Sequence, residues 1–153
     1  MKKLISLILV TIFLTSCTLS FKLKGFVYGH SIRQMEADYL KEAKAALGEK
    51  PAVNVYTSGL KKYNRIKDAR EVKISEEEAE FQVDKTMLQP QFAKMFLDFL
   101  VQQSIDKPQQ KPEDVLNAFL AQNPEPWPTE SFTVRLILKK SGDLWDVASE
   151  TRL

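Results

Sequence analysis

The chain has 153 residues and a mass of 17.5 kDa, with 44% hydrophobic and 27% charged residues. This length is that of one domain, and this composition excludes a low-complexity or collagen-like chain. Residues 1–16 hold Lys2 and Lys3 and no acidic residue, so the rest of the chain has 20 basic and 20 acidic residues. A neutral chain offers no excess of cations for phosphate binding, which argues against a nucleic-acid partner.

The first sixteen residues have the pattern of an export signal. Lys2 and Lys3 precede the apolar run 4–14, in which only Ser6 and Thr11 are polar. A helix that crosses a ~30 Å hydrocarbon core needs about 20 residues, so this run is too short for a membrane span. Its length and its basic flank are those of a cleaved secretory signal.

The next residues, Leu14-Thr15-Ser16-Cys17, resemble the bacterial lipobox, in which an aliphatic and two small residues precede a cysteine. The resemblance implies a diacylglyceryl group on the Cys17 thiol, cleavage before Cys17, and acylation of the new amine, for example with palmitate. The alternative is a secreted protein whose only cysteine lies there by chance. We expect Cys17 to be a lipidation site, because its place at the end of the apolar run makes a chance cysteine unlikely. Two or three acyl chains would anchor the protein stably to a membrane.

The lipobox resemblance also implies a location in the bacterial cell envelope, with the protein held on a membrane through its N-terminal lipid and facing the periplasm or the exterior. Thr18 follows Cys17 where the sorting pattern for inner-membrane retention has aspartate. In a source with two membranes, this favours the outer one. Because Cys17 is the only cysteine, we expect no disulfide in the mature fold.

A tether is expected over residues 17–30, followed by a single domain over residues 31–153. Five large apolar residues in the tether are too many for a solvated linker, so some should pack on the domain or lie at the membrane interface. A helix is predicted from Ser31, a suitable N-cap, to Gly48, which ends it. Its apolar face consists of Ile32, Met35, Tyr39, Ala43, Ala46 and Leu47.

The middle of the chain mixes strands and helices. Residues 52–70 fit either a short strand or a helical turn, and residues 71–88 alternate as strands around an acidic turn at residues 76–78. Helices are predicted after Pro90 and from Pro112. The first of these carries a bulky stripe that we interpret as core: Phe92, Met95, Phe96, Phe99, Leu100 and Gln103.

Three prolines surround Trp127 in the segment 123–128 and favour an extended conformation. We interpret Trp127 as a lid on the core, and the alternative is an exposed contact with an envelope protein partner. A buried indole with its N–H paired inside the domain would indicate the lid. A terminal hairpin is predicted over residues 132–147, with Gly142 in its turn.

The expected core contains residues from each predicted element: Ile32, Met35, Tyr39, Phe81, Val83, Phe96, Phe99, Val134, Leu136 and Trp145. The densest basic stretch is interpreted as a solvated face, with contact to a membrane or an acidic ligand as the alternative; it comprises Lys61, Lys62, Arg65, Lys67 and Arg70.

Two segments resemble the cystatin-like α+β superfamily, also called nuclear-transport-factor-2-like. Residues 138–147, Leu-Lys-Lys-Ser-Gly-Asp-Leu-Trp-Asp-Val, resemble its last hairpin, and residues 72–83, with Ala79-Glu80-Phe81, resemble a paired strand of its small bacterial lipoproteins. The resemblance implies an N-terminal helix packed on a curved antiparallel sheet. With the helices predicted at Pro90 and Pro112, the expected fold class is α+β with a two-helix insert before the C-terminal hairpin.

That superfamily includes enzymes and binding domains, so the fold does not decide the function. The sequence has no zinc, serine-hydrolase or phosphate-loop motif, and we assign no catalytic residue, metal ligand or cofactor. His30, the only histidine, is interpreted as a helix-entry or exposed residue. We expect a non-enzymatic binding or assembly domain. The alternative is an isomerase- or hydrolase-type enzyme with its site in the α+β cone, which requires a closed apolar pocket of about 300 Å³ or more with a buried ionisable side chain.

Overall fold

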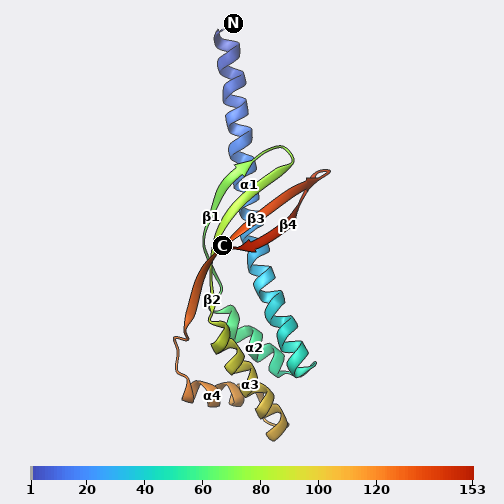
Figure 1. Cartoon of the computed structure of the whole chain (residues 1–153), viewed down its shortest axis with the longest axis vertical. Coiled ribbons are helices and arrows are strands. Elements are labelled where there is room, and N and C mark those ends of the chain that lie inside the picture. The colour runs from blue at the N-terminus through green and yellow to red at the C-terminus, as the bar shows by residue number, and fades with distance from the viewer. Residues whose placement is uncertain (1) are drawn as a thin grey trace. The chain divides into compact units, whose positions relative to one another are not determined.

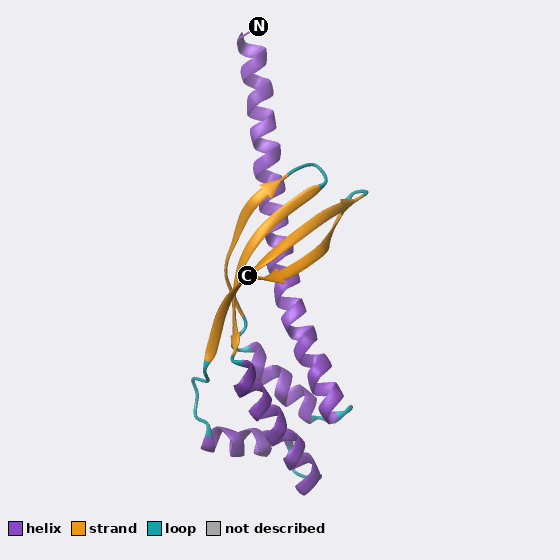
Figure 2. Ribbon diagram, viewed as in Figure 1, coloured by secondary structure: helices purple, strands orange, loops and turns teal. Residues whose placement is uncertain are grey.

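The computed structural model describes the backbone of residues 2–153 and the side chains from residue 18 onward. Its elements are, in chain order, α1 (Lys2–Leu47), α2 (Ala52–Lys61), β1 (Arg65–Ile74), β2 (Glu78–Leu88), α3 (Pro90–Asp106), α4 (Pro112–Gln122), β3 (Thr129–Ser141) and β4 (Leu144–Arg152) (Figure 1). The strands form one antiparallel sheet in the order β1-β2-β3-β4 (Figure 2). The fold is α+β, with α3 and α4 inserted before the C-terminal hairpin, as predicted.

Helix α1 begins far ahead of Ser31, so the predicted N-cap at Ser31 is wrong, and the residues predicted as a tether are helical. The buried residues of α1 follow one another at intervals of four: Leu23, Val27, Ser31, Met35, Tyr39, Ala43 and Leu47. Leu23 and Val27 extend the apolar repeat towards the N-terminus without a proline to interrupt it, which is why the helix continues. Ala46, predicted on the buried face, is exposed, and Ile32 is only partly buried.

The residues group into two compact units, and α1, β1, β2 and β3 each continue from one unit into the other. Unit 1 holds the residues up to Ser31 together with Asp68–Asp84 and Thr133–Leu153. Unit 2 holds Ile32–Lys67 and Lys85–Phe132. The single domain predicted for residues 31–153 stays a prediction.

In unit 1, α1 packs on the sheet. Leu23 and Val27 are buried, and the Ser20 hydroxyl donates a 2.5 Å hydrogen bond to the Glu71 carboxylate on β1. The sheet turns apolar side chains inward: Ala79, Phe81, Val83, Val134, Leu136 and Leu138. The hairpin of β3 and β4 is antiparallel and closes through Gly142, whose φ of +63° favours glycine, as predicted.

Trp145 is only partly buried, which corrects its assignment to the core. The physical reason is the place of its strand, because β4 lies at the edge of the sheet and has a neighbour on one side only.

In unit 2, the C-terminal part of α1 packs with α2, α3 and α4 around an aromatic core. The undecided segment 52–70 forms α2 and most of β1. On α3 the buried residues are Ala93, Phe96, Leu97 and Leu100, which share one helical face. Met95 and Phe99 lie away from the centre of that face, so Met95 is 42% exposed and Phe99 partly buried, contrary to the predicted stripe and core.

Candidate functional site

The two residues that the sequence singles out, Cys17 and Trp127, belong to different units. Position 17 lies within the backbone of α1, but the side chain of Cys17 lies outside the described residues, so its lipidation stays a prediction. The first buried side chain after it is Leu23, about 9 Å further along the helix axis at 1.5 Å per residue. Among the described residues, no helix has a stretch long and apolar enough to cross a bilayer.

Trp127 is the central side chain of an aromatic cluster in unit 2. Its indole is 4% exposed, and its ring centroid lies 5.1 Å from that of Phe96, 5.3 Å from that of Phe92 and 5.6 Å from that of Phe119. Tyr63 stacks on the indole at 5.5 Å and 18°. These rings come from α3, α4 and the segment after α2, so Trp127 covers the helical core of unit 2.

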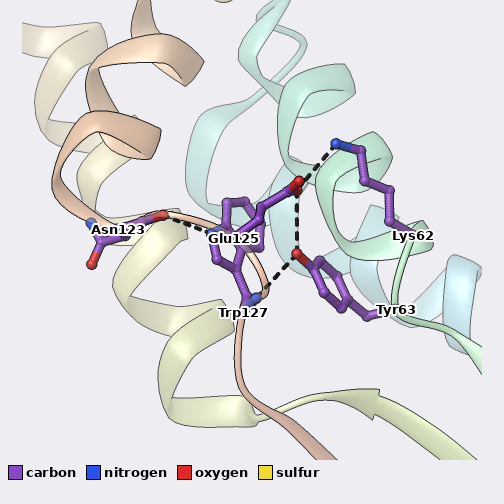
Figure 3. A network of polar contacts seen from close by, with 5 residues as sticks. All are labelled: Lys62, Tyr63, Asn123, Glu125 and Trp127. Carbon is purple, nitrogen blue, oxygen red and sulfur yellow. Dashed lines mark hydrogen bonds and ion pairs between the residues drawn. The ribbon is translucent and has the colours of Figure 1, made fainter.

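A polar network holds the segment around Trp127 in place (Figure 3). The indole N–H donates to the Asn123 carbonyl at 2.9 Å, and the Trp127 backbone N–H donates to the Tyr63 hydroxyl at 3.3 Å. That hydroxyl donates to Glu125 at 3.2 Å, and the same carboxylate oxygen accepts from Lys62 at 3.3 Å. Burial raises the pKa of the Tyr63 phenol, the bond from the Trp127 backbone opposes the rise, and the charge of Glu125 adds to it.

The buried, paired indole is the geometry that indicates a lid on the core. The indole N–H, the Trp127 backbone N–H and the Tyr63 hydroxyl are each bonded to another residue of unit 2. The chemical effect of the network is to hold the segment 123–128 against the helices. We therefore do not propose Trp127 as the contact with a partner.

Gly59 of α2 shows how tightly this cluster is packed. A Cβ built at Gly59 lies 3.0 Å from the Phe96 ring and 3.5 Å from the Trp127 ring, whereas a Cβ at Gly25 of α1 meets nothing within 4 Å. Because the rings around Gly59 are fixed by their neighbours, we expect Gly59→Ala to lower the free energy of unfolding by about 1–3 kcal/mol. Gly25→Ala is the matched control and should raise it by about 0.5–1 kcal/mol through helix propensity. Urea denaturation measures both, and a Gly59→Ala protein as stable as the wild type would contradict the packing.

Most of the basic stretch 61–70 is engaged with neighbours of its own unit. Lys61 pairs with Glu36 at 3.1 Å and Lys67 donates to the Ser131 hydroxyl at 3.0 Å, both in unit 2. In unit 1, Arg70 pairs with Asp84 at 3.1 Å. Together with the Lys62–Glu125 pair, these contacts favour the interpretation as a solvated, locally paired face.

Three surface hollows bear on the enzymatic alternative. One of about 230 Å³ lies between the start of α2 and the segment joining α3 and α4, with Lys50 and Lys107 at its rim. One of about 390 Å³ lies between α1 and α2 beside Glu36 and Lys61, and one of about 410 Å³ lies at the hairpin turns of unit 1. The ionisable residues that line them are exposed or half-buried. None of the three is therefore the closed apolar pocket with a buried ionisable group that the alternative requires.

His30 lies within α1 rather than at a helix entry, because the helix begins earlier than predicted. It stacks on Phe26 at a centroid distance of 6.2 Å, and its Nε2 lies 4.0 Å from the carboxylate of Glu150 on β4. Its side chain is 25% exposed, so the expectation of an exposed residue is only partly met. No group of three or more potential metal ligands occurs in the part of the chain that the structure describes.

Comparison with known proteins adds no relative: no family model, no curated protein and no solved structure matches this chain.

Proposed function

We propose that this protein is a lipoprotein of the bacterial cell envelope, anchored to a membrane through Cys17 and serving as a non-enzymatic binding or assembly domain. The observation that carries the proposal is the sequence Leu14-Thr15-Ser16-Cys17 at the end of a short apolar run with a basic flank.

The binding role rests on what the described surface presents. Exposed apolar side chains lie on both edge strands of the sheet, with Val72 of β1 51% exposed and Leu144 of β4 72% exposed. Apolar groups left in solvent at sheet edges favour contact with another molecule. The cystatin-like resemblance is compatible with this role, because that superfamily includes binding domains.

Metabolic labelling with an alkyne fatty acid tests the anchor. We expect the wild-type protein to incorporate the label and to remain with the membrane fraction, because the thiol of Cys17 accepts the lipid as a thioether. The Cys17→Ala protein should incorporate no label, and no processed protein should be found in the membrane fraction. Ser16→Ala is the matched control, since it keeps a small residue before the cysteine and should be labelled like the wild type. Label retained by the Cys17→Ala protein would refute the anchor.

A further inference from the structure

The stretch of α1 that follows Cys17 has an unusual exposed face. Phe21 is 79% exposed and Tyr28 is 37% exposed, although both are large aromatic residues of a helix that packs on a sheet. Gly25 lies between them, with open space where a Cβ would be. Exposed aromatic rings on one face of a helix indicate a surface that contacts a membrane or another molecule.

The proposed lipid attachment site, position 17, lies on the same face of α1. Phe21 lies four residues after position 17, and Tyr28 lies seven residues after Phe21, so the three positions share one face of a helix with 3.6 residues per turn. The distance from position 17 to Tyr28 is about 16 Å along the axis at 1.5 Å per residue. The acyl chains and the two rings would therefore be presented along the same line.

The flanks of the face carry positive charge. Lys22 is exposed and Lys24 is partly buried, and their spacing places them on opposite sides of the line through Phe21 and Tyr28. When an aromatic face of a helix inserts into a membrane, lysine side chains beside it can extend to the phosphates of the lipid head groups. No acidic residue occurs between Thr18 and Tyr28, so nothing on this segment opposes an anionic membrane.

The helix leaves little freedom between the anchor and the fold. Leu23 and Val27, on the side of α1 away from Phe21, are buried in unit 1, and Ser20 is bonded to Glu71 of the sheet. A lipid on Cys17 would thus lie about 9 Å along the helix axis from the buried Leu23 rather than at the end of a flexible linker. The sheet covers one side of α1, and the side that carries Phe21 and Tyr28 is exposed to solvent.

We infer that the α1 segment from Thr18 to Tyr28 lies along the membrane surface, with Phe21 and Tyr28 inserted among the lipid head groups beside the acylated Cys17. This inference rests on the proposed lipid anchor. It adds that the membrane contact has two parts. The acyl chains anchor the protein, and the aromatic face of α1 binds the bilayer surface. Unit 1 is thereby held with its sheet on the side of α1 away from the membrane.

A single introduced cysteine tests this arrangement, because Cys17 is the only native cysteine and its thiol is blocked once lipid is attached. Full-length lipidated Phe21→Cys and Tyr28→Cys proteins are labelled with an environment-sensitive fluorophore. They are then reconstituted in vesicles of phosphatidylethanolamine and phosphatidylglycerol that contain a nitroxide-bearing lipid as quencher. Both positions are exposed, so the substitutions leave the core intact, which circular dichroism verifies.

Ser149→Cys provides the matched control on the outer side of unit 1. Glu150 points towards α1, since its carboxylate lies 4.0 Å from His30, and the neighbouring Ser149 therefore faces the other side of the sheet. We expect severalfold stronger quenching at positions 21 and 28 than at position 149.

Intact mass of the same preparations separates the two ways of failing. If the lipid is attached but positions 21 and 28 are quenched no more than position 149, the membrane-surface arrangement is overturned and the anchor stands. If no lipid is attached, the proposed anchor and this inference both fall.

Discussion

Replacing Phe96 by alanine is expected to lower the free energy of unfolding by about 3–5 kcal/mol, which is a large fraction of the stability of a small protein. Phe96 is fully buried, and its ring centroid lies 4.6 Å from that of Phe119, 5.1 Å from that of Trp127 and 5.8 Å from that of Tyr56. Removing the ring leaves a cavity between three helices and the lid segment. The surrounding aromatic rings are rigid, so the cavity cannot close by small adjustments.

Met95→Ala is the matched control for this substitution. Met95 precedes Phe96 on the same helix but is 42% exposed, so the same truncation should change the stability by less than about 1 kcal/mol. Urea denaturation followed by circular dichroism measures both variants. Equal midpoints for the two variants would show that Phe96 is not at the centre of the unit 2 core.

Alkaline pH is expected to destabilise unit 2 through its buried tyrosines. Burial raises the pKa of Tyr39 to about 12, and the carboxylates of Glu42 and Asp38 act in the same direction. Burial also raises the pKa of Tyr56, whose hydroxyl donates a 2.9 Å hydrogen bond to Glu42. The native state therefore holds these phenol protons more tightly than the unfolded state, in which tyrosine ionises near pH 10.

The sign of the effect follows from this difference in proton binding. Stability from the neutral phenols is fully present below about pH 10 and is lost as the pH rises through the native pKa values. One pKa unit corresponds to 1.36 kcal/mol, so between about pH 10 and its raised pKa Tyr39 alone lowers the free energy of unfolding by on the order of 1 kcal/mol per pH unit. Urea midpoints measured from neutral pH to about pH 11 should fall progressively above about pH 10.

Two phenylalanine variants assign this alkaline loss to particular residues. Tyr56→Phe removes one buried phenol, so the midpoint should fall less steeply with pH, although the loss of the bond to Glu42 lowers the stability at neutral pH. Tyr28→Phe changes an exposed ring of unit 1, outside the unit 2 core, and should leave the urea midpoint at neutral pH as it is in the wild type. A steep alkaline loss that persists unchanged in Tyr56→Phe would contradict the role of this residue.

Signals that act within a few residues predicted much of the secondary structure correctly. Pro90 and Pro112 are in the first turns of α3 and α4, and Gly48 and Gly142 adopt the positive φ angles expected of them. In each case the conformation of one residue is decided by its own sterics, so no distant contact is needed to infer it. The resemblance of residues 14–17 to a lipobox is equally local, and the proposed anchor rests on it.

Burial was harder to predict, because it depends on which distant segments meet. Ser31 has the chemistry of an N-cap, yet it is buried in the middle of α1. Lys85 follows Ala79, Phe81 and Val83 in the inward alternation of β2 and is 2% exposed, although lysine usually remains in solvent. Both positions are decided by the packing of the surrounding elements, which overrides the preference of the single residue.

The sequence by itself determined the prolines that begin α3 and α4, the glycine that follows α1, the turn of the terminal hairpin and the α+β class. Only the tertiary structure decided that Trp127 covers the helical core, that α1 runs through the expected tether, and that Phe21 and Tyr28 are left exposed on its outer side. The reason is that backbone propensity depends on neighbouring residues, whereas the face that a helix buries depends on elements far away in the sequence. Strand β1, for example, places Glu71 beside Ser20 of α1, about 50 residues earlier in the chain.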